Sequence, residues 1–153
     1  LLQAAPDWYA IIIGRGSLGD ELTRRLTDAG LLDRCRLIPQ LPNEQVHVYY
    51  HACDAFVNLN DQGIFGMSLL EAMAYGRCCV TSDIPECADV LAGNGVTFGK
   101  GSADSLRAAL RDLLTDADRA DVLGTSAKTH VEKTYNWDSV VERTLELYRG
   151  SAR

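Results

Sequence analysis

The sequence lacks the features that mark nucleic-acid-binding and membrane-spanning proteins. Its 15 lysines and arginines are outnumbered by 21 acidic residues, and the net charge of −6 argues against duplex DNA or RNA as the main partner. The longest apolar runs are far shorter than the roughly 20 residues that cross a bilayer. No repeat, low-complexity segment or internal linker interrupts the 153 residues, so we expect one domain over residues 1–153 with a real core.

The five cysteines also lack the C-x-x-C spacing of a metal site. Cys78 and Cys79 are adjacent in a predicted strand, and we interpret the cysteines as small apolar core residues in a reducing compartment. Leu1 to Pro6 has neither the basic region nor the long apolar run of a signal peptide. We therefore expect a cytoplasmic protein without a transmembrane segment, whose full-length form can lie peripherally on the inner face of the membrane.

What the chain does have is an alternation of short apolar runs with segments of helical periodicity. The run from Trp8 to Ile13 is continuous, which predicts a strand buried on both faces. The predicted strands are 8–13, 36–38, 55–59, 78–82 and 95–98. The predicted helices are 20–29, 43–52, 66–75, one from 85, one that begins at Ser102 or Asp104 and ends near 115, and 118–148 with a break at 135–136. This order predicts an α/β, Rossmann-like parallel sheet with helices on both faces.

The helix predicted over Gly66 to Tyr75 carries the strongest functional signal. It is apolar on nearly every face, so we expect it to be buried, with Glu71 as a buried carboxylate that needs a partner. The amides of Gly66, Met67 and Ser68 lack intrahelical acceptors and form an anion site. A phosphate on these amides and a sugar diol on Glu71 together describe a nucleotide-sugar. The alternatives are that local amides saturate Glu71 and that Gly66 serves only close packing.

Seven motifs follow one another along the chain: Gly14-Arg15-Gly16, Leu41-Pro42, Phe65-Gly66, Leu69 to Gly76, Ile84-Pro85-Glu86, Gly95 to Phe98, and Trp137 to Tyr148. In this order the chain resembles the C-terminal, donor-binding half of a GT-B fold glycosyltransferase of the family 4 type (glycosyl transferases group 1). The resemblance runs from about residue 1 to residue 148. The order and spacing of the motifs together carry it, because each motif alone is weak.

The resemblance implies a domain that binds a nucleotide-diphospho-sugar donor, such as a UDP-sugar or a GDP-sugar. The whole enzyme would transfer a hexosyl group with retention, without metal or other cofactor, in polysaccharide, lipid-linked or glycoconjugate biosynthesis. The resemblance assigns the ribose hydroxyls to Glu71. The other donor-binding residues that it implies are Phe65, Gly66, Met67 and Ser68 at the sugar and diphosphate, Gly14 and Gly16 at the phosphates, and the main chain of Gln40 and Leu41 at the base. Arg15 lies inside the glycine loop and can approach a phosphate.

This chain departs from the family pattern at three places. One is that no Lys stands at the second of the two basic positions that grip the diphosphate in the family. The first of two glutamates in the family stands eight positions before the second, where this chain has Gly63, so no catalytic residue is assigned. Asp83 replaces a glycine pair before Ile84, and Asp83 and Glu86 are further candidates for donor or acceptor contacts. The resemblance also implies that the N-terminal acceptor domain and the first strand of this domain are absent from the chain. We therefore expect the isolated domain to be inactive.

Three other interpretations are kept beside this one. Gly63 favours a non-catalytic nucleotide-binding or scaffold domain. The residues from Gly14 to Gly19 match the dinucleotide pattern G-x-G-x-x-G, but the segment from Ile38 to Leu41 supplies no carboxylate for the ribose of NAD. His47 and His51 are four residues apart on one predicted helix and could share a metal, although no Glu or Cys nearby completes a site.

The C-terminal helix carries an apolar stripe of helical spacing, made of Trp137, Val140, Val141, Leu145 and Tyr148. The resemblance implies that this helix crosses toward the absent domain. We therefore expect part of the stripe to be exposed, or to be masked by another chain, for example in a dimer.

Overall fold

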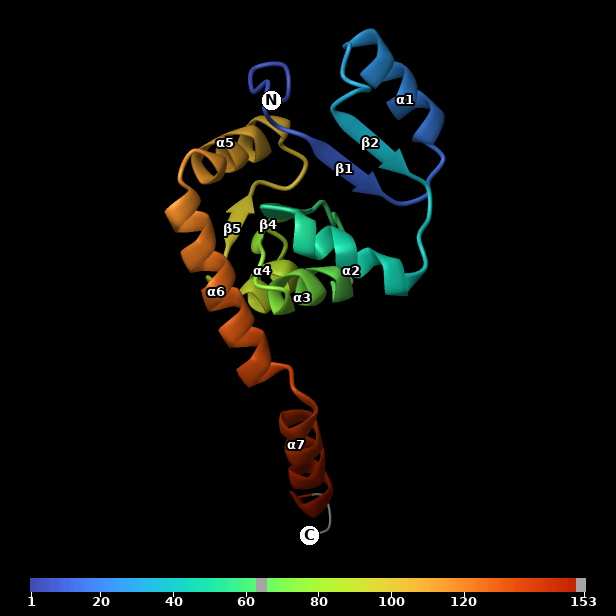
Figure 1. The fold of residues 1–153 in the computed structure, drawn as a ribbon. Helices are drawn as coiled ribbons and strands as arrows, with labels where there is room; N and C mark the ends of the chain where they lie inside the picture. Colours follow the sequence, from blue (N-terminus) through green and yellow to red (C-terminus); the bar gives the residue numbers. More distant parts are fainter. Residues whose placement is uncertain (63–65, 151–153) are drawn as a thin grey trace. The chain divides into compact units, whose positions relative to one another are not determined.

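The computed structural model describes residues 1–62 and 66–150, and the chain divides into two compact units, Leu1–Tyr49 and Tyr50–Arg153 (Figure 1). The strands are β1 (Ala10–Ile13), β2 (Cys35–Ile38), β3 (Ala55–Asn58), β4 (Cys78–Ser82) and β5 (Val96–Phe98). The helices are α1 (Gly19–Asp28), α2 (Asn43–Ala52), α3 (Met67–Ala74), α4 (Pro85–Leu91), α5 (Ala103–Leu114), α6 (Ala117–Thr134) and α7 (Trp137–Gly150). Each predicted element is present, with bounds that agree within two residues.

In the first unit, β1 and β2 pair in parallel, with Ala10 opposite Cys35 and Ile13 opposite Ile38. The prediction that the apolar run of β1 is buried is wrong for this unit, because the side chains of Ile11, Ile12 and Ile13 are 49%, 43% and 36% exposed. A continuous apolar run is buried on both faces only where layers cover both faces of the sheet. A sheet of two strands does not provide that cover.

The second unit contains a parallel sheet in the order β3-β4-β5, with Ala55 opposite Cys78 and Ser82 opposite Phe98. All five residues of the central strand β4 are buried, as expected for a strand covered on both faces. Helices α3 and α4 pack on β4, and α6 packs on β4 and α3. One core cluster consists of Cys78, Val80, Phe98 and Leu113, with partly buried residues of β3, β5, α5 and α6 around it. The predicted α/β class is thus confirmed.

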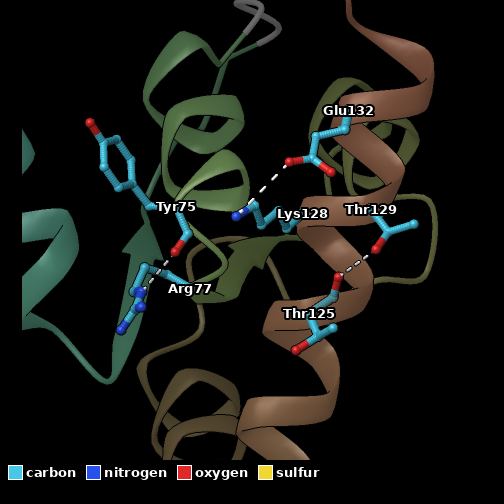
Figure 2. Close-up of polar contacts among 6 residues, drawn as sticks. All are labelled: Tyr75, Arg77, Thr125, Lys128, Thr129 and Glu132. Carbon is cyan, nitrogen blue, oxygen red and sulfur yellow. Dashed lines mark hydrogen bonds and ion pairs between the residues drawn. The ribbon is translucent and has the colours of Figure 1, made fainter.

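Helix α6 approaches the turn between α3 and β4 closely, and two glycines allow this. Gly76 has a φ of +68°, a conformation that favours glycine, and a Cβ built on Gly124 would lie 2.2 Å from the Gly76 carbonyl oxygen. Beside this contact, the Arg77 Nε donates to the Tyr75 carbonyl at 3.2 Å, and an ion pair links Lys128 to Glu132 on α6 (Figure 2). The site helix α3 is therefore anchored at its C-terminal end by backbone packing.

Four of the five cysteines are buried and Cys53 is half-buried, and all five are free thiols. Their predicted role as small core residues is thus confirmed for Cys35, Cys78, Cys79 and Cys87. Burial raises the pKa of the Cys78 thiol from its ordinary value of 9.0 to about 11, and burial also raises the pKa of Cys79.

These raised pKa values predict a loss of stability at alkaline pH. The folded state holds the thiol protons more tightly than the unfolded state, so their contribution is fully present below pH 9 and falls as the pH rises toward 11. For Cys78 alone we expect the free energy of unfolding to fall by about 1.4 kcal/mol per pH unit in this window. Urea unfolding at pH 8, 9 and 10 measures this slope. Cys78→Ala should reduce the measured slope by that amount, and an unchanged slope in that variant would refute the assignment.

The predicted exposure of the C-terminal stripe is confirmed. Trp137 is 81% exposed, and the other four residues of the stripe, Val140, Val141, Leu145 and Tyr148, are exposed as well. The break before this helix also lies where it was predicted, since α6 ends at Thr134 and the Asn136 side chain accepts the Ser139 N–H at 2.7 Å. Among the described residues, the helices are too short or too polar to cross a bilayer.

Candidate functional site

Helix α3 is amphipathic, which corrects the prediction that it is apolar and buried on nearly every face. Leu69, Leu70, Ala72 and Met73 are buried, whereas Met67, Ser68, Glu71 and Ala74 are exposed. The period of 3.6 residues puts the second set on one stripe. This stripe consists of an exposed methionine, a serine, an alanine and the glutamate. The high average apolarity of the segment therefore does not reveal that one side of the helix faces solvent.

Glu71 is therefore an exposed carboxylate, and the prediction that it is buried is wrong. It nevertheless has the partner that the sequence required. The hydroxyl of Tyr50, near the end of α2, donates to Glu71 Oε2 at 2.9 Å. Tyr50 itself is only 5% exposed, and burial followed by the Glu71 hydrogen bond raises the pKa of this phenol above its usual range. Tyr50 therefore stays protonated and remains a donor at neutral pH.

The exposed first residues of α3, Met67 and Ser68, lie on the same side of the helix as Glu71. Gly66 is its N-cap and, lacking a side chain, leaves the first amides without a side-chain acceptor among the described residues. The carbonyl of Gly66 accepts the N–H groups of Leu69 and Leu70, at 2.9 and 3.1 Å. From Met67 to Glu71 the helix rises by about 6 Å. Partial positive charge and a carboxylate are thus spaced one helical turn apart on one exposed face.

Gly66 is also closely packed. A Cβ built on it would lie 3.3 Å from the Leu69 Cβ and 3.5 Å from the Asn58 amide nitrogen. The close-packing interpretation of Gly66 therefore has structural support of its own. It is compatible with a backbone contact to a ligand, since the same small residue serves both.

In the first unit, the structure brings together two predicted site residues that are 25 positions apart. A guanidinium nitrogen of Arg15, in the loop after β1, donates to the side-chain oxygen of Gln40, in the loop after β2. Both residues are exposed, and Leu41 is half-buried. Cβ atoms built on Gly14 and Gly16 would meet open space. The loop thus has room for a ligand, and the roles of Arg15, Gly14, Gly16, Gln40 and Leu41 stay predictions.

The second unit has a cavity of about 270 Å³ at the carboxyl ends of β3, β4 and β5. It is lined by Leu59, Asn60, Asp61, Ser82, Phe98, Lys100, Gly101, Ser102, Ala103 and Leu106. Asp61 lies in the loop after β3, and Ser82 is the last residue of β4. The Asp83 carboxylate accepts the backbone N–H of Lys100 at 2.8 Å, so it ties the loop after β5 to the loop after β4. A structural role for Asp83 is therefore sufficient to explain this carboxylate.

Two predicted positions, Gly63 and Phe65, lie outside the described residues. The metal interpretation of His47 and His51 gains no support, because within residues 1–62 and 66–150 no three His, Cys, Asp or Glu side chains gather as metal ligands do. The His51 ring instead packs edge-on against Tyr75, with ring centroids 4.6 Å apart. His51 is thus a packing residue at the end of α2.

Tyr50 is the site residue that the sequence does not reveal, because it belongs to none of the motifs that carry the resemblance. It lies 21 positions before Glu71, and no local motif joins the two. The only available signal was a general one: a buried tyrosine hydroxyl needs a hydrogen-bond partner. Several polar groups could have met that need.

The family model described as glycosyl transferases group 1 matches residues 1–130. The chain belongs to this family. The group 1 domain is 30% identical, over 97% of its length, to a GDP-mannose:cellobiosyl-diphosphopolyprenol alpha-mannosyltransferase of Xanthomonas oryzae. It is 34% identical, over all of its length, to the lipopolysaccharide core biosynthesis mannosyltransferase LpsB of Rhizobium meliloti. It spans 41% and 46% of these two relatives, so it corresponds to less than half of each.

Solved structures support the GT-B assignment of the group 1 domain. The Anabaena protein HepE, solved with UDP, matches with a TM-score of 0.86 at 18% identity, over 97% of this chain and 42% of that one. The C-terminal domain of the Francisella tularensis group 1 protein LpcC matches with a TM-score of 0.80 at 23% identity, over 89% of this chain and 74% of that one. At these identities the likeness concerns the fold.

Proposed function

We propose that this group 1 domain binds the nucleotide-diphospho-sugar donor of a glycosyltransferase. The observation that carries the proposal is the exposed stripe of α3, where Glu71 stands one turn from the uncapped helix N-terminus. A carboxylate can accept hydrogen bonds from both ribose hydroxyls, and helix amides bind phosphate oxygens. A nucleoside diphosphate carries both groups.

The whole protein would transfer a hexosyl group from this donor to an acceptor hydroxyl, with retention. The bond from the anomeric carbon to the diphosphate oxygen breaks, a bond to the acceptor oxygen forms, and the hydroxyl proton is released. The departing diphosphate gains negative charge, which the α3 amides would stabilise without a metal. The UDP complex of HepE is compatible with such a donor, and the names of the mannosyltransferase relatives favour GDP-mannose.

Titration of the 153-residue chain with UDP, GDP, ADP and NADH by calorimetry tests the proposal. We expect one nucleoside diphosphate to bind at least about tenfold more tightly than NADH, because the helix N-terminus favours a free terminal phosphate. Of the nucleoside diphosphates, we expect GDP to bind more tightly than UDP. A preference for NADH would refute the proposal and favour the dinucleotide interpretation of the Gly14–Gly19 loop.

A non-catalytic nucleotide-binding or scaffold domain is the second candidate, and Gly63 favours it because a family carboxylate is replaced there. Binding alone does not separate the two candidates. An assay of donor hydrolysis and sugar transfer with the full-length protein does. Tight nucleotide binding without either reaction, across UDP-sugars and GDP-sugars, would support the scaffold.

A further inference from the structure

The hydrogen bond between Tyr50 and Glu71 joins a buried donor to an exposed acceptor. An exposed glutamate on a helix normally samples several side-chain rotamers, and fixing them costs up to about 2 kcal/mol of conformational entropy. Here Oε2 is already engaged by the Tyr50 hydroxyl at 2.9 Å. The ordering of Glu71 thus precedes the arrival of any ligand.

The ring of Tyr50 is held on two sides. It stacks on Tyr75, with centroids 5.5 Å apart and planes at 20°, and it meets Phe56 edge-on at 5.7 Å. The backbone that carries these rings is fixed as well, because the Arg77 guanidinium donates to the carbonyls of Tyr75 and Cys53, at 3.2 and 3.1 Å. Arg77 therefore ties the end of α3 to the segment just after α2, and the hydroxyl of Tyr50 is delivered from a rigid position.

We propose that Tyr50 is a positioning residue, which holds the Glu71 carboxylate in the rotamer that accepts the ribose hydroxyls of the nucleotide. A carboxylate offers about four lone-pair directions, and the Tyr50 hydroxyl occupies one of them. Oε1 and the remaining directions are left for the diol. This role rests on the proposed donor-binding function, and it adds a specificity determinant on α2 to the site on α3.

Tyr50→Phe tests the role, because it removes the hydroxyl and keeps the ring in its stack. UDP and GDP are titrated into the full 153-residue chain beside their 2′,3′-dideoxy forms, which lack the diol. In the unmodified chain we expect the ribonucleotide to bind more tightly than the dideoxynucleotide. The ribose preference is the ratio of the Kd of the dideoxynucleotide to the Kd of the ribonucleotide. Tyr50→Phe should reduce this ratio by about 3- to 10-fold, the value of one hydrogen bond, and leave dideoxynucleotide binding nearly unchanged.

Tyr49→Phe is the matched control, since it removes a hydroxyl from the neighbouring position of α2 and leaves the Tyr50–Glu71 bond in place. Its ratio should equal that of the unmodified chain. Glu71→Asp is a second variant that does not endanger folding, because position 71 is exposed. The shorter side chain cannot reach both Tyr50 and the ribose, so it should lower the ratio to a similar extent.

The outcomes separate the two proposals. An equal loss for ribonucleotide and dideoxynucleotide in Tyr50→Phe, or no loss for either, would overturn the positioning role. So would a ratio in Glu71→Asp that equals that of the unmodified chain. If Glu71→Gln abolishes the ribose preference but Tyr50→Phe does not, the donor site stands and only the role of Tyr50 is wrong. If Glu71→Gln also leaves the preference intact, the ribose assignment under the proposed function has failed.

Discussion

Replacing Glu71 with alanine should weaken nucleoside diphosphate binding by about 10- to 100-fold. The carboxylate would accept charge-assisted hydrogen bonds from the ribose hydroxyls, and such bonds contribute about 1.5–3 kcal/mol. The effect should be confined to nucleotides that carry the diol, because the phosphates would be bound one turn away at Met67 and Ser68. Calorimetric titration with GDP and UDP measures the loss directly.

Two variants make this result interpretable. Glu132→Ala removes another exposed helical glutamate, whose partner Lys128 lies 3.9 Å away, and should leave nucleotide affinity unchanged. Glu71→Ala also leaves the buried Tyr50 hydroxyl without its acceptor, at a cost of about 1–3 kcal/mol in stability. Glu71→Gln keeps an acceptor for Tyr50 and removes the charge, so it separates affinity from stability. Unchanged affinity in both Glu71 variants would contradict the ribose assignment.

The sequence predicts the order of elements well because each boundary has a local chemical cause. Ser102 and Asp104 are both suited to begin a helix, and in the structure Ser102 is the N-cap of α5, with its hydroxyl accepting the Ser105 N–H at 3.2 Å. Pro85 occupies the first turn of α4, where its missing N–H is not needed. Gly76 ends the α3 segment in a left-handed conformation. Caps and helix ends depend on neighbours in sequence, so a single chain suffices to predict them.

The sequence predicts burial less well, because burial depends on which layers cover an element. The apolar run of β1 and the apolar stretch of α3 gave the same expectation, and both expose apolar side chains, those of Ile11 and Met67 among them. In α3 the error lay in using mean apolarity instead of the helical stripe that contains Glu71. To predict burial, one must know where a second element packs, and the local spacing of apolar residues does not give that information.

In the candidate site too, the residues of one local motif are predictable from the sequence, and those that meet through tertiary packing are not. Glu71, Gly66 and the amides of Met67 and Ser68 belong to one continuous motif, so sequence alone places them on one helix end. Tyr50 and Glu71 meet only through tertiary packing. Tyr50 and the cavity at the ends of β3, β4 and β5 are therefore contributions of the structure, and Arg15 with Gln40 is a pairing that the sequence did not reveal.

Gly124→Ala should destabilise the chain by about 3 kcal/mol, near the upper end of typical overpacking costs. Gly124 lies inside α6, where alanine would ordinarily stabilise a helix by about 1 kcal/mol. Here the added methyl would lie 2.2 Å from the Gly76 carbonyl oxygen and 3.1 Å from its carbon. These are backbone atoms at the end of the site helix, so they cannot move aside as a flexible side chain would, and α6 must shift away from α3.

The matched control is Gly19→Ala, which adds the same methyl at the start of α1, where a built Cβ would meet open space. It should be neutral or slightly stabilising, since only helix propensity acts there. Urea unfolding of both variants measures the difference. Equal stabilities would show that α6 does not depend on contact with the Gly76 turn. Because that turn ends α3, the loss in Gly124→Ala should also lower nucleotide affinity, which links the packing of α6 to the position of Glu71.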